Sequence, residues 1–562
     1  MDYKQIIADA VHIDGVSAQE IYELLALPKD TSMGDFCLPC FKFAKQMRIS
    51  PLAIAQNIAT SIVAPESFSH VEAVGGYVNF RLNKTQYARK VLDKILAEND
   101  NFGCSSIGKG KTICIDYSSV NIAKPFHMGH LLNTCIGSAL YKICVALGYN
   151  VVGINHLGDW GTQFGKLIVA YKLWGDKADI DKRGVRGLLD IYVRFHAEAE
   201  KDEALNDQAR FWFKQIENGN QEAIDLWTWF KKITLAEVAK IYKRLDVRFD
   251  SYNGESFYND KMQPILDELK EKGLLEKSEG AEIVRFDNDE LPPCLLVRAD
   301  GATLYATRDL AAAFYRKKTY DFYKCLYVVA YQQNLHFQQV FKVIEKMGCE
   351  WSKDLEHVAH GMVSLEDGAL STRSGNVVFL EDVLNKAVEK ALAVIEEKNP
   401  NIANKSEIAE QVGVGAIIFG VLFNNRIKDS VFSYDKVLNF EGETGPYAQY
   451  TFARCNSVLE KGGDIVGDID WDGIDSEEGA NLVRLLDRFP EAVEEAGRRY
   501  EPSIVTRHII EVAKAFNKFY FEHNINNADQ PIKNARLILA KATKIVLSKG
   551  LGLLGIATPS HM

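Results

Sequence analysis

The clearest pattern of apolar and polar positions lies between residues 111 and 155. "KTICIDYSS" contains a short apolar run of the kind found in a buried strand, and "NVVGIN" is a second such run. Between them, apolar residues recur every three or four positions from Leu131 to Leu147, and Gly148 follows as a C-terminal cap. Strand, helix and strand in this short space predict a βαβ unit with a parallel sheet.

Patterning elsewhere predicts three domains. Residues 1–105 form an α+β domain, because "ISPLAIAQNIATSIV" has helical spacing, "VGGYVNFRLN" alternates like a strand, and "ENDNFGCSSIGKGK" has the composition of a linker. Residues 106–385 form the parallel-sheet domain, with a helical insertion at about 170–280. After the insertion, "CLLVRADGATLYATRDLAAAFYR" and "CLYVVAYQQN" are expected to resume the sheet. Residues 386–562 are expected to be almost entirely helical.

Composition excludes several classes of protein. The chain has 562 residues, of which 47% are hydrophobic, and it contains no apolar run near the ~18 residues of a membrane span. Its first residues lack a signal-like segment, so a cytoplasmic location is expected. Ten cysteines are too few for a disulfide scaffold, and Cys37 and Cys40 have no second C-x-x-C pair. They are expected to be buried thiols, and no structural metal is predicted.

Charge is distributed unevenly along the chain. The net charge of −10 argues against a protein that coats nucleic acid by bulk electrostatics. From Pro531 onward, however, the sequence contains no Asp or Glu, and five cations remain there. They are Lys533, Arg536, Lys541, Lys544 and Lys549. Such a local segment suits contacts with phosphates.

The segment "AKPFHMGHLL" lies between the first strand and the helix of the predicted βαβ unit. A helix start offers free N–H groups and a positive dipole end to an anion. Lys124 adds a charge, Pro125 suits the bend, and Gly129 allows close approach to the backbone. A metal site would need a third ligand beside His127 and His130, and a dinucleotide site would need G-x-G-x-x-G. A phosphate site is therefore predicted.

With its neighbours, this motif resembles class I aminoacyl-tRNA synthetases, and specifically the arginyl-tRNA synthetase family of bacterial type. The resemblance rests on His127-Met128-Gly129-His130 and on "DYSSVNIAKPFHMGHLLNT", "HLGDWGTQFGKL", "LYATRDLAAA", "STRSGNVVFLEDVL", "ETGPYAQYTFAR" and "GLGLLGIATP". "MGDFCLPCFKFAK" and "VGGYVNFRL" resemble that family's N-terminal domain. The resemblance implies a Rossmann-like catalytic domain, an N-terminal domain that binds the tRNA D-loop, and a helical anticodon-binding domain.

The resemblance also implies a reaction. ATP, as its Mg²⁺ complex, activates L-arginine to arginyl-adenylate, and the arginyl group then moves to the 3′-terminal ribose of tRNA-Arg with release of AMP and pyrophosphate. A monomer is expected, with no membrane partner. Alternatives are a glutamyl or cysteinyl enzyme of the same class, or a non-catalytic RNA-binding paralogue. The intact Lys124, His127, His130 and Asp309 argue against the paralogue.

One signature departs from the class I pattern. The second signature normally carries two lysines, but the matching stretch here, "ALSTRSG" at residues 369–375, has none. Lys124 is expected to supply the missing charge, with Arg373 adding a second. The catalytic candidates are Lys124, His127, His130 and Arg373. The ATP-binding candidates are His127, Gly129, His130, His336, Gly361, Met362, Val363, Ser371, Thr372 and Ser374.

The amino-acid pocket is expected to hold a guanidinium with carboxylates. Asp309 and Tyr305, one helical turn apart, resemble the guanidinium-binding pair, and Glu255 is a third group. Gln333, or Gln332 beside it, would close the pocket. The arginine-binding candidates are Asp116, Ser119, Asn121, His130, Glu255, Tyr305, Asp309 and Gln333. His156, Asp159 and Gln163 could also line the pocket, and Asp116 has the alternative role of a satisfied strand-end acid.

A pocket that bonds a charged group can reject analogues lacking it by ~10⁴ or more, so citrulline should be rejected without an editing domain. For tRNA, the resemblance points to Tyr77 and Asn79 in the N-terminal domain, which share one strand face. In the helical domain, the candidates are Tyr447, Tyr450 and Arg454. Phe516 and Tyr520 are alternatives there, although Phe516 and Phe519 have the spacing of core residues.

Overall fold

The chain divides into two compact units in the computed structural model. The first comprises residues 1–99, 458–487 and 515–545, and the second comprises the remainder. The described residues are 3–28, 30, 33–65, 67–287, 291–365 and 378–562.

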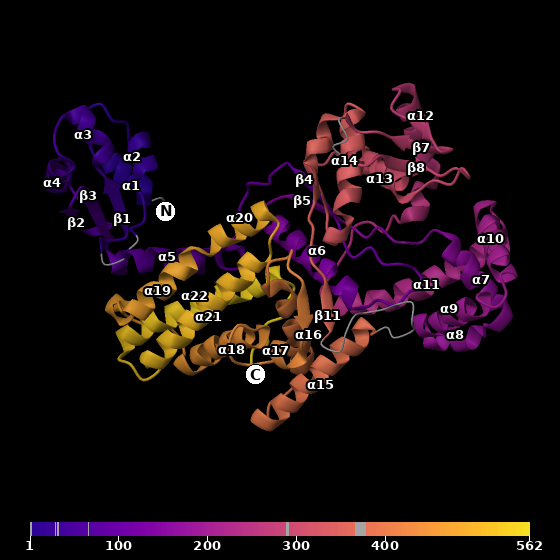
Figure 1. The fold of residues 1–562 in the computed structure, drawn as a ribbon. Coiled ribbons are helices and arrows are strands. Elements are labelled where there is room, and N and C mark those ends of the chain that lie inside the picture. The colour runs from indigo at the N-terminus through magenta and orange to yellow at the C-terminus, as the bar shows by residue number, and fades with distance from the viewer. Residues whose placement is uncertain (1–2, 29, 31–32, 66, 288–290, 366–377) are drawn as a thin grey trace. The chain divides into compact units, whose positions relative to one another are not determined.

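The first unit contains an antiparallel sheet with strand order β1-β3-β2. These strands are β1 (Phe36–Pro39), β2 (Phe68–Val74) and β3 (Tyr77–Leu82). Four helices belong with the sheet: α1 (Tyr3–Ala10), α2 (Ala18–Leu24), α3 (Phe41–Met47) and α4 (Pro51–Ser61) (Figure 1). They share one apolar core with the inner face of the sheet, which includes Val78 and Phe80. The predicted helix and strand of this region are confirmed as α4 and β3.

Helices complete the first unit. α5 (Lys84–Glu98) packs against α19 (Glu477–Asp487), and the Tyr87 hydroxyl donates a 2.9 Å hydrogen bond to Asp487. Residues 515–522 of α21 (Ser503–Glu522) and residues 530–545 of α22 (Gln530–Leu553) also belong to this unit, and Phe516 and Phe519 are buried, which confirms their expected place in the core.

The second unit is built on a parallel sheet with strand order β10-β9-β4-β5. Its strands are β4 (Thr112–Asp116), β5 (Asn150–Ile154), β9 (Lys324–Tyr327) and β10 (Leu355–His357). α6 (Met128–Ala146) connects β4 to β5, so the predicted βαβ unit is confirmed. β5 pairs with β4 on one side, and β9, which comes later in the chain, pairs with β4 on the other side. The carboxyl end of β4, at Asp116, is thus the point where open parallel sheets bind ligands.

The insertion after β5 begins as a group of helices. They are α7 (Thr162–Trp174), α8 (Lys177–Arg183), α9 (Val185–Ala199), α10 (Ala204–Glu217) and α11 (Gln221–Arg244). The turn η3 (Glu255–Lys261) and α12 (Met262–Glu271) follow. The core of the first five helices includes Phe164, Phe195 and Phe230, with Trp160, Trp174 and Trp227 packed at its edge.

One strand expectation is wrong. "CLLV" forms β8 (Cys294–Val297), which joins β6 (Glu276–Ser278) and β7 (Ala281–Val284) in a separate antiparallel sheet. The parallel sheet resumes only at β9. A four-residue apolar run is equally suited to either sheet, so its pattern could not distinguish them. α13 (Tyr305–Tyr320) lies between the two sheets in the chain, and η5 (Tyr331–Gln333) and α14 (Asn334–Lys346) follow β9.

The predicted linker is also partly wrong. From Asp100 the segment packs onto the second unit, where Phe102 is 1% exposed and stacks on Phe489 with ring centroids 6.2 Å apart. The N–H groups of Ser105 and Gly108 donate to the carbonyls at the end of α6. Glycine and serine here allow tight turns against a helix end rather than free motion.

The remaining elements are mainly helical. η6 (Glu350–Asp354) precedes β10, and β11 (Val363–Leu365) pairs with β12 (Ser430–Phe432). The helices are α15 (Leu380–Lys398), α16 (Lys405–Phe423), α17 (Tyr434–Val437), α18 (Gly445–Gly462) and α20 (Phe489–Arg499), with the turn η7 (Trp471–Ile474). By length and composition α16 could cross a membrane, yet 67% of its most apolar 18-residue window is buried in the protein, as in a core helix.

Candidate active site

A buried ion pair lies at the carboxyl end of β4. Arg316 Nη2 is 2.6 Å from Asp116 Oδ2, and the Ser119 hydroxyl donates to Asp116 Oδ1 at 2.9 Å. Asp116 and Arg316 are 6% and 1% exposed. Ser118 and Ser119 adopt left-handed backbone conformations, with φ of 69° and 48°, which non-glycine residues adopt at a cost. The loop after β4 is thus held in a strained form that brings Ser119 onto Asp116.

Arg316 was not identified from the sequence. It lies on α13, two hundred positions from Asp116, and its guanidinium also approaches His156 Nδ1 at 3.4 Å. A local signal existed, because Arg316 lies on α13 among positions such as Leu310 and Ala313 that are fully buried. A charge on the apolar face of a helix indicates a buried partner.

His127 and His130 form a reciprocal cap at the start of α6. His127 Nδ1 accepts from the Gly129 N–H at 3.0 Å, and His130 Nδ1 accepts from the His127 N–H at 3.3 Å. Both rings must therefore carry their proton on Nε2, where it is a hydrogen-bond donor. A Cβ at Gly129 would lie 2.7 Å from His127 Cε1, so glycine is needed for the His127 ring to fold over the helix start.

The two imidazoles are neutral at physiological pH. Burial, and then the charge of Lys124, lowers the pKa of His127. Burial, followed by the influence of His127, lowers the pKa of His130 to about 3. The rings can thus offer Nε2–H donors without carrying a charge of their own.

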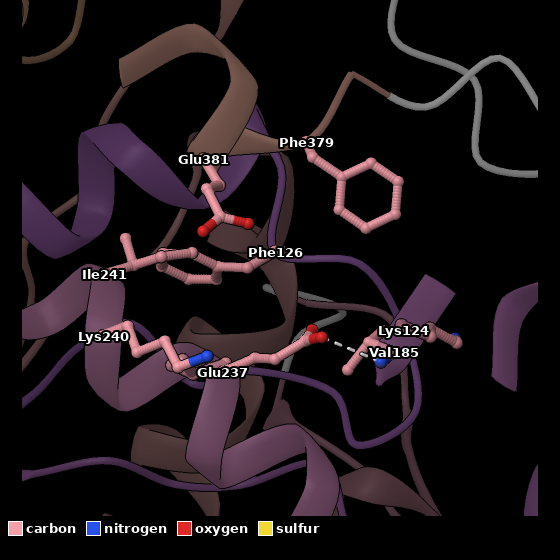
Figure 2. Close-up of a pocket in the computed structure, with 9 residues that line it drawn as sticks. Lys124, Phe126, Val185, Glu237, Lys240, Ile241, Phe379 and Glu381 are labelled. Atoms are coloured by element: carbon pink, nitrogen blue, oxygen red, sulfur yellow. Dashed lines mark hydrogen bonds between the residues drawn. The ribbon is translucent and has the colours of Figure 1, made fainter. Parts of the chain in front are cut away.

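Lys124 borders a small cavity of about 50 Å³ (Figure 2). Its other walls are Phe126, Val185, Glu237, Val238, Lys240, Ile241, Phe379 and Glu381. Two carboxylates and two lysines therefore surround this space. Glu237 accepts a 3.0 Å hydrogen bond from the Val185 N–H at the start of α9, as the dashed line in Figure 2 marks. Burial raises the pKa of Glu237.

The signature segment is also joined to the start of α15. The Leu380 N–H donates to the Phe126 carbonyl at 2.9 Å, and Phe379 forms a β-bridge with His127. The Arg186 guanidinium lies 3.9 Å from the centroid of the Phe379 ring and bonds Asp382 at 2.7 Å. Insertion helix α9 thereby supports the backbone beside the histidines.

The expected guanidinium end lies on the first turns of α13. Asp309 Oδ2 is 2.6 Å from His336 Nε2, and about a quarter of the Asp309 side chain is exposed. Burial alone would raise the pKa of Asp309, but the hydrogen bond and charge of His336 bring it below its usual value. Tyr305 is 69% exposed, and Gln332 and Gln333 are both exposed where η5 meets α14.

Glu255 joins this end of the pocket from η3. Its carboxylate lies 3.9 Å from Arg308 Nη1 and is largely buried. Burial raises the pKa of Glu255 to about 7, with Arg308 opposing the rise and Asp309 adding to it. Asp309, His336 and Glu255 are therefore brought together by the fold, as the sequence led us to expect for the two acids.

Asp159 has a different setting from the one expected. Its side chain is fully buried, Lys231 Nζ lies 2.6 Å from Oδ2, and Ser256 donates through both its N–H and its hydroxyl. It therefore ties the insertion helix α11 to η3. His156 is partly exposed and stacks on Tyr258, and Asn121 pairs with Gly158 through a β-bridge beside Asp116.

The expected ATP segment after β10 is packed against residues 426–430. The Gly361 N–H donates to the Arg426 carbonyl at 2.8 Å, and the Met362 N–H donates to Asp429 at 2.7 Å. Val363 is buried in β11, whereas Met362 is 37% exposed. This segment thus offers the Met362 side chain at its surface. Ser371, Thr372, Arg373 and Ser374 lie outside the described residues.

The tRNA candidates are divided between the two units. Tyr447, Tyr450 and Arg454 follow one face of α18, and the Arg454 guanidinium lies 4.8 Å from the Tyr450 ring centroid. In the acid-free C-terminal segment, Arg536 and Lys549 instead donate to backbone carbonyls of Gly473, Asn524 and Asp100. Tyr77 is 41% exposed, but Asn79 is 1% exposed.

The two cysteines of the C-x-x-C pair were expected to be buried thiols. Cys37 and Cys40 are both buried free thiols, and burial raises the pKa of Cys40 to about 11. Within the described part of the chain, no group of three or more His, Cys, Asp or Glu residues is arranged to hold a metal ion.

Three protein families match successive parts of the chain. Residues 1–82 match the "Arginyl tRNA synthetase N terminal domain", residues 91–434 match "tRNA synthetases class I (R), catalytic domain", and residues 448–562 match the "DALR anticodon binding domain". The architecture therefore has three domains: N-terminal, parallel-sheet catalytic and helical.

Individual proteins agree with these families. The arginine–tRNA ligases of Alkaliphilus metalliredigens and Clostridium acetobutylicum are 51% and 50% identical to the chain, and each match covers 100% of both proteins. The arginyl-tRNA synthetase structure of Thermus thermophilus has a TM-score of 0.80 at 26% identity over 96% of each chain. That of Plasmodium falciparum shares the fold, with a TM-score of 0.76 at 24% identity over 96% of this chain and 94% of that one. These matches set aside the glutamyl and cysteinyl alternatives, and the chain belongs to the arginyl-tRNA synthetase family of class I aminoacyl-tRNA synthetases.

Proposed function

We propose that this arginine–tRNA ligase carries out its chemistry in the crevice at the carboxyl end of β4. The observation that supports the location is that Asp116 ends β4, the His127–His130 cap starts the helix that follows β4, and α13 supplies both Arg316 to Asp116 and Asp309 to His336. L-arginine and ATP react to give arginyl-adenylate, and the arginyl group is then transferred to the 3′-terminal ribose of tRNA-Arg. Pyrophosphate and AMP are the released products.

The α-amino end of arginine is assigned to Asp116, Ser119 and Asn121. Asp116 is already oriented by Arg316 and Ser119, and a carboxylate retains acceptor sites beyond two hydrogen bonds. Asp116 can therefore accept a hydrogen bond from the α-ammonium group without first reorganising. His130, the third residue of α6, would lie beside the substrate carboxylate.

The guanidinium end is assigned to Asp309 and Tyr305, with Glu255 as a further acid and Gln333 closing the pocket. Two carboxylates match the planar array of N–H donors of a guanidinium better than they match the donors of an ammonium group. His336, which is bonded to Asp309, would orient this carboxylate and meet ATP on its other side.

Adenylate formation requires two anions to be held in line. A carboxylate oxygen of arginine attacks the α-phosphorus of ATP, the bond to the β-phosphate oxygen breaks, and pyrophosphate leaves. Lys124 and Arg373 would offset the charge that develops on pyrophosphate, and the Nε2–H groups of His127 and His130 would bond phosphate oxygens. The remaining ATP contacts are Gly129, Gly361, Met362, Val363, Ser371, Thr372 and Ser374. ATP arrives as its Mg²⁺ complex.

Transfer follows in the same crevice. A hydroxyl of the terminal ribose attacks the carbonyl carbon of the adenylate, and AMP leaves as the ester bond forms. Tyr77 and Asn79 are assigned to the D-loop, and Tyr447, Tyr450 and Arg454 to the anticodon side of the tRNA. These roles correspond to domains at residues 1–105, 106–385 and 386–562, in a cytoplasmic monomer.

ATP–pyrophosphate exchange tests the assignment. Each of the twenty amino acids is assayed with and without tRNA-Arg. Arginine should support the fastest exchange, and tRNA should raise the rate because enzymes of this type commonly need it for the first step. Faster exchange with any other amino acid would exclude the assignment.

The role of Lys124 is tested by Lys124→Ala. The substitution should lower the adenylation rate by roughly 10²–10³, the usual loss when one group stabilising developing charge is removed. Affinity for tRNA should hardly change. Lys240→Ala is the matched control, because Lys240 borders the same cavity but is exposed. Full activity of Lys124→Ala would refute the hypothesis that Lys124 replaces the lysines missing from the second signature.

A further inference from the structure

Two exposed aromatic rings meet on the first unit. Phe41, the first residue of α3, is 53% exposed, and Tyr77, the first residue of β3, is 41% exposed. Their ring centroids are 5.2 Å apart and the ring planes are inclined by 73°. Phe41 thus presents a large apolar surface directly beside a residue assigned to tRNA.

The Phe41 ring packs over a glycine turn. A Cβ at Gly76 would lie 2.7 Å from Phe41 Cζ and 3.0 Å from Pro51 Cβ. Only a glycine lets the Phe41 ring lie across the β2–β3 turn, between that turn and the start of α4. The ring thus packs against Gly76 and Tyr77 on one side, which lowers the cost of ordering it when a ligand stacks on it.

Asn79 adds an unused donor on the same strand face. It follows Tyr77 by two residues, so both side chains lie on the face opposite to the core residues Val78 and Phe80. Asn79 is 1% exposed, yet its Nδ2 has no hydrogen-bond partner among the residues that the structure describes. Because an unpaired buried donor is costly, it points to an acceptor supplied by a ligand.

The charge on α3, beside the two rings, is uniformly positive, and Glu72, opposite Asn79 on β2, is paired with Arg81 at 3.1 Å. From Phe36 to Pro65 the sequence contains no Asp or Glu, although the chain carries a net charge of −10. Its three cations, Lys42, Lys45 and Arg48, all lie exposed on α3 or at its end. Lys45 follows Phe41 by four residues and so lies on the same side of the helix.

We propose that Phe41, with Lys42, Lys45 and Arg48, binds a second nucleotide of the tRNA loop that Tyr77 and Asn79 contact. The inference rests on the proposed function of Tyr77 and Asn79. Aromatic rings with adjacent cations are features that bind single-stranded RNA: the ring stacks on a base, and the cation contacts a phosphate. Because the rings are inclined by 73°, two bases stacked on them are splayed apart. An unstacked loop can adopt that geometry, and a continuous helix cannot.

Binding of tRNA-Arg transcripts to the full-length protein tests the proposal. Phe41→Ala and Phe41→Leu should each weaken binding about tenfold, since base–aromatic stacking contributes ~1–3 kcal/mol. Leucine retains apolar area but removes the stacking surface. The control is Val63→Ala, because Val63 is 87% exposed on the same unit. Lys42→Ala and Lys45→Ala should each reduce the slope of log affinity against log salt by about 1.

Abasic substitutions, placed at each loop position in turn, separate the two nucleotides. In the wild-type protein, two positions should be sensitive. Phe41→Ala should lose sensitivity at one of them, and Tyr77→Ala should lose it at the other. The inference is overturned if Phe41→Ala binds like wild type, or if both variants lose sensitivity at the same position. It is also overturned if Phe41→Ala changes only self-association in sedimentation, which would make the patch a dimer contact.

The proposed function fails in a distinguishable way. If Tyr77→Ala binds tRNA normally, the assignment of Tyr77 and Asn79 is wrong, whatever Phe41 does. If Tyr77→Ala weakens binding and Phe41→Ala does not, only the second nucleotide is refuted. Circular dichroism spectra of all variants show whether the first unit remains folded.

Discussion

The two ends of the proposed amino-acid pocket are built differently, although α13 serves both. At the α-amino end, Asp116 is buried and held by Arg316 and Ser119. At the guanidinium end, Tyr305 is 69% exposed and Asp309 is partly exposed beside His336. Arg316 and Asp309 are seven residues apart on α13, or ~10 Å along a helix axis. One rigid helix therefore sets the distance between the two ends.

This difference suggests a division of labour. The α-amino group is common to all amino acids, so a prebuilt site there holds the reacting carboxylate in place without selecting a side chain. Selection must occur at the other end. There, a substrate that leaves the polar groups of the site unpaired is disfavoured. Substitutions at the first end should therefore lower activity for every substrate, and those at the second should change specificity.

The largest effect on stability is expected for Arg316→Met. It leaves the Asp116 carboxylate buried and unpaired, a change that typically costs about 3–5 kcal/mol. Thermal unfolding measures the loss, and Asp116→Asn should restore much of it in the double variant. Arg285→Met is the control, because Arg285 pairs with Glu276 at 2.9 Å with both side chains about half exposed. Exposed pairs contribute ~0–1 kcal/mol. Equal losses for the two variants would contradict a buried structural pair.

A smaller but more specific effect is expected for Asp309→Asn. Loss of a charged hydrogen-bond partner should lower kcat/KM for arginine about 10²-fold while the KM for ATP stays nearly constant. Asp300→Asn, in the exposed loop before α13, should be neutral. If ATP binding weakened and arginine binding did not, Asp309 would belong to the nucleotide site.

A moderate pH effect should come from Glu255, whose pKa is raised to about 7. Below that pH the carboxyl group is protonated and neutral, and above it the carboxylate attracts the guanidinium. The KM for arginine should therefore fall several-fold as the pH rises from 6 to 8. Glu255→Gln should flatten this profile. If the Glu255→Gln variant kept the wild-type profile, the ionisation would belong to another group, although not to His130, whose pKa is lowered to about 3.

The smallest effect is expected for Tyr305→Phe. The hydroxyl lies on a largely exposed side chain, and a neutral hydrogen bond contributes ~0.5–1.5 kcal/mol. The KM for arginine should rise about two- to tenfold. Tyr252→Phe, also exposed, is a suitable control. A loss as large as that of Asp309→Asn would mean that this end is also preorganised.

Sequence patterns predicted what depends on neighbours in the chain. The unit β4–α6–β5, the helix start beside His127 and the strand-end position of Asp116 all follow from spacing within a few residues. The pairing of Arg316 with Asp116 joins residues two hundred positions apart, and no local rule identifies which buried acid a helix arginine meets.

Other misinterpretations have the same origin. Asp159 follows a strand and was expected to line the pocket, but its buried carboxylate is taken up by Lys231 and by Ser256, the neighbour of Glu255. β8 and Phe102 each carry local signals compatible with two structures, and distant partners decide between them. For β8 the partner is β7, and for Phe102 it is Phe489.

The central claim, that orientation and selection occupy opposite ends, is tested most directly by the discrimination between arginine and citrulline in ATP–pyrophosphate exchange. Wild-type protein, Asp309→Asn and Asp116→Asn are compared by their kcat/KM for each substrate. In Asp309→Asn the preference for arginine should collapse, because arginine loses its charged partner and citrulline does not. In Asp116→Asn both substrates should decline together and the preference should persist. A preference that survives Asp309→Asn, or collapses in Asp116→Asn, would contradict the account.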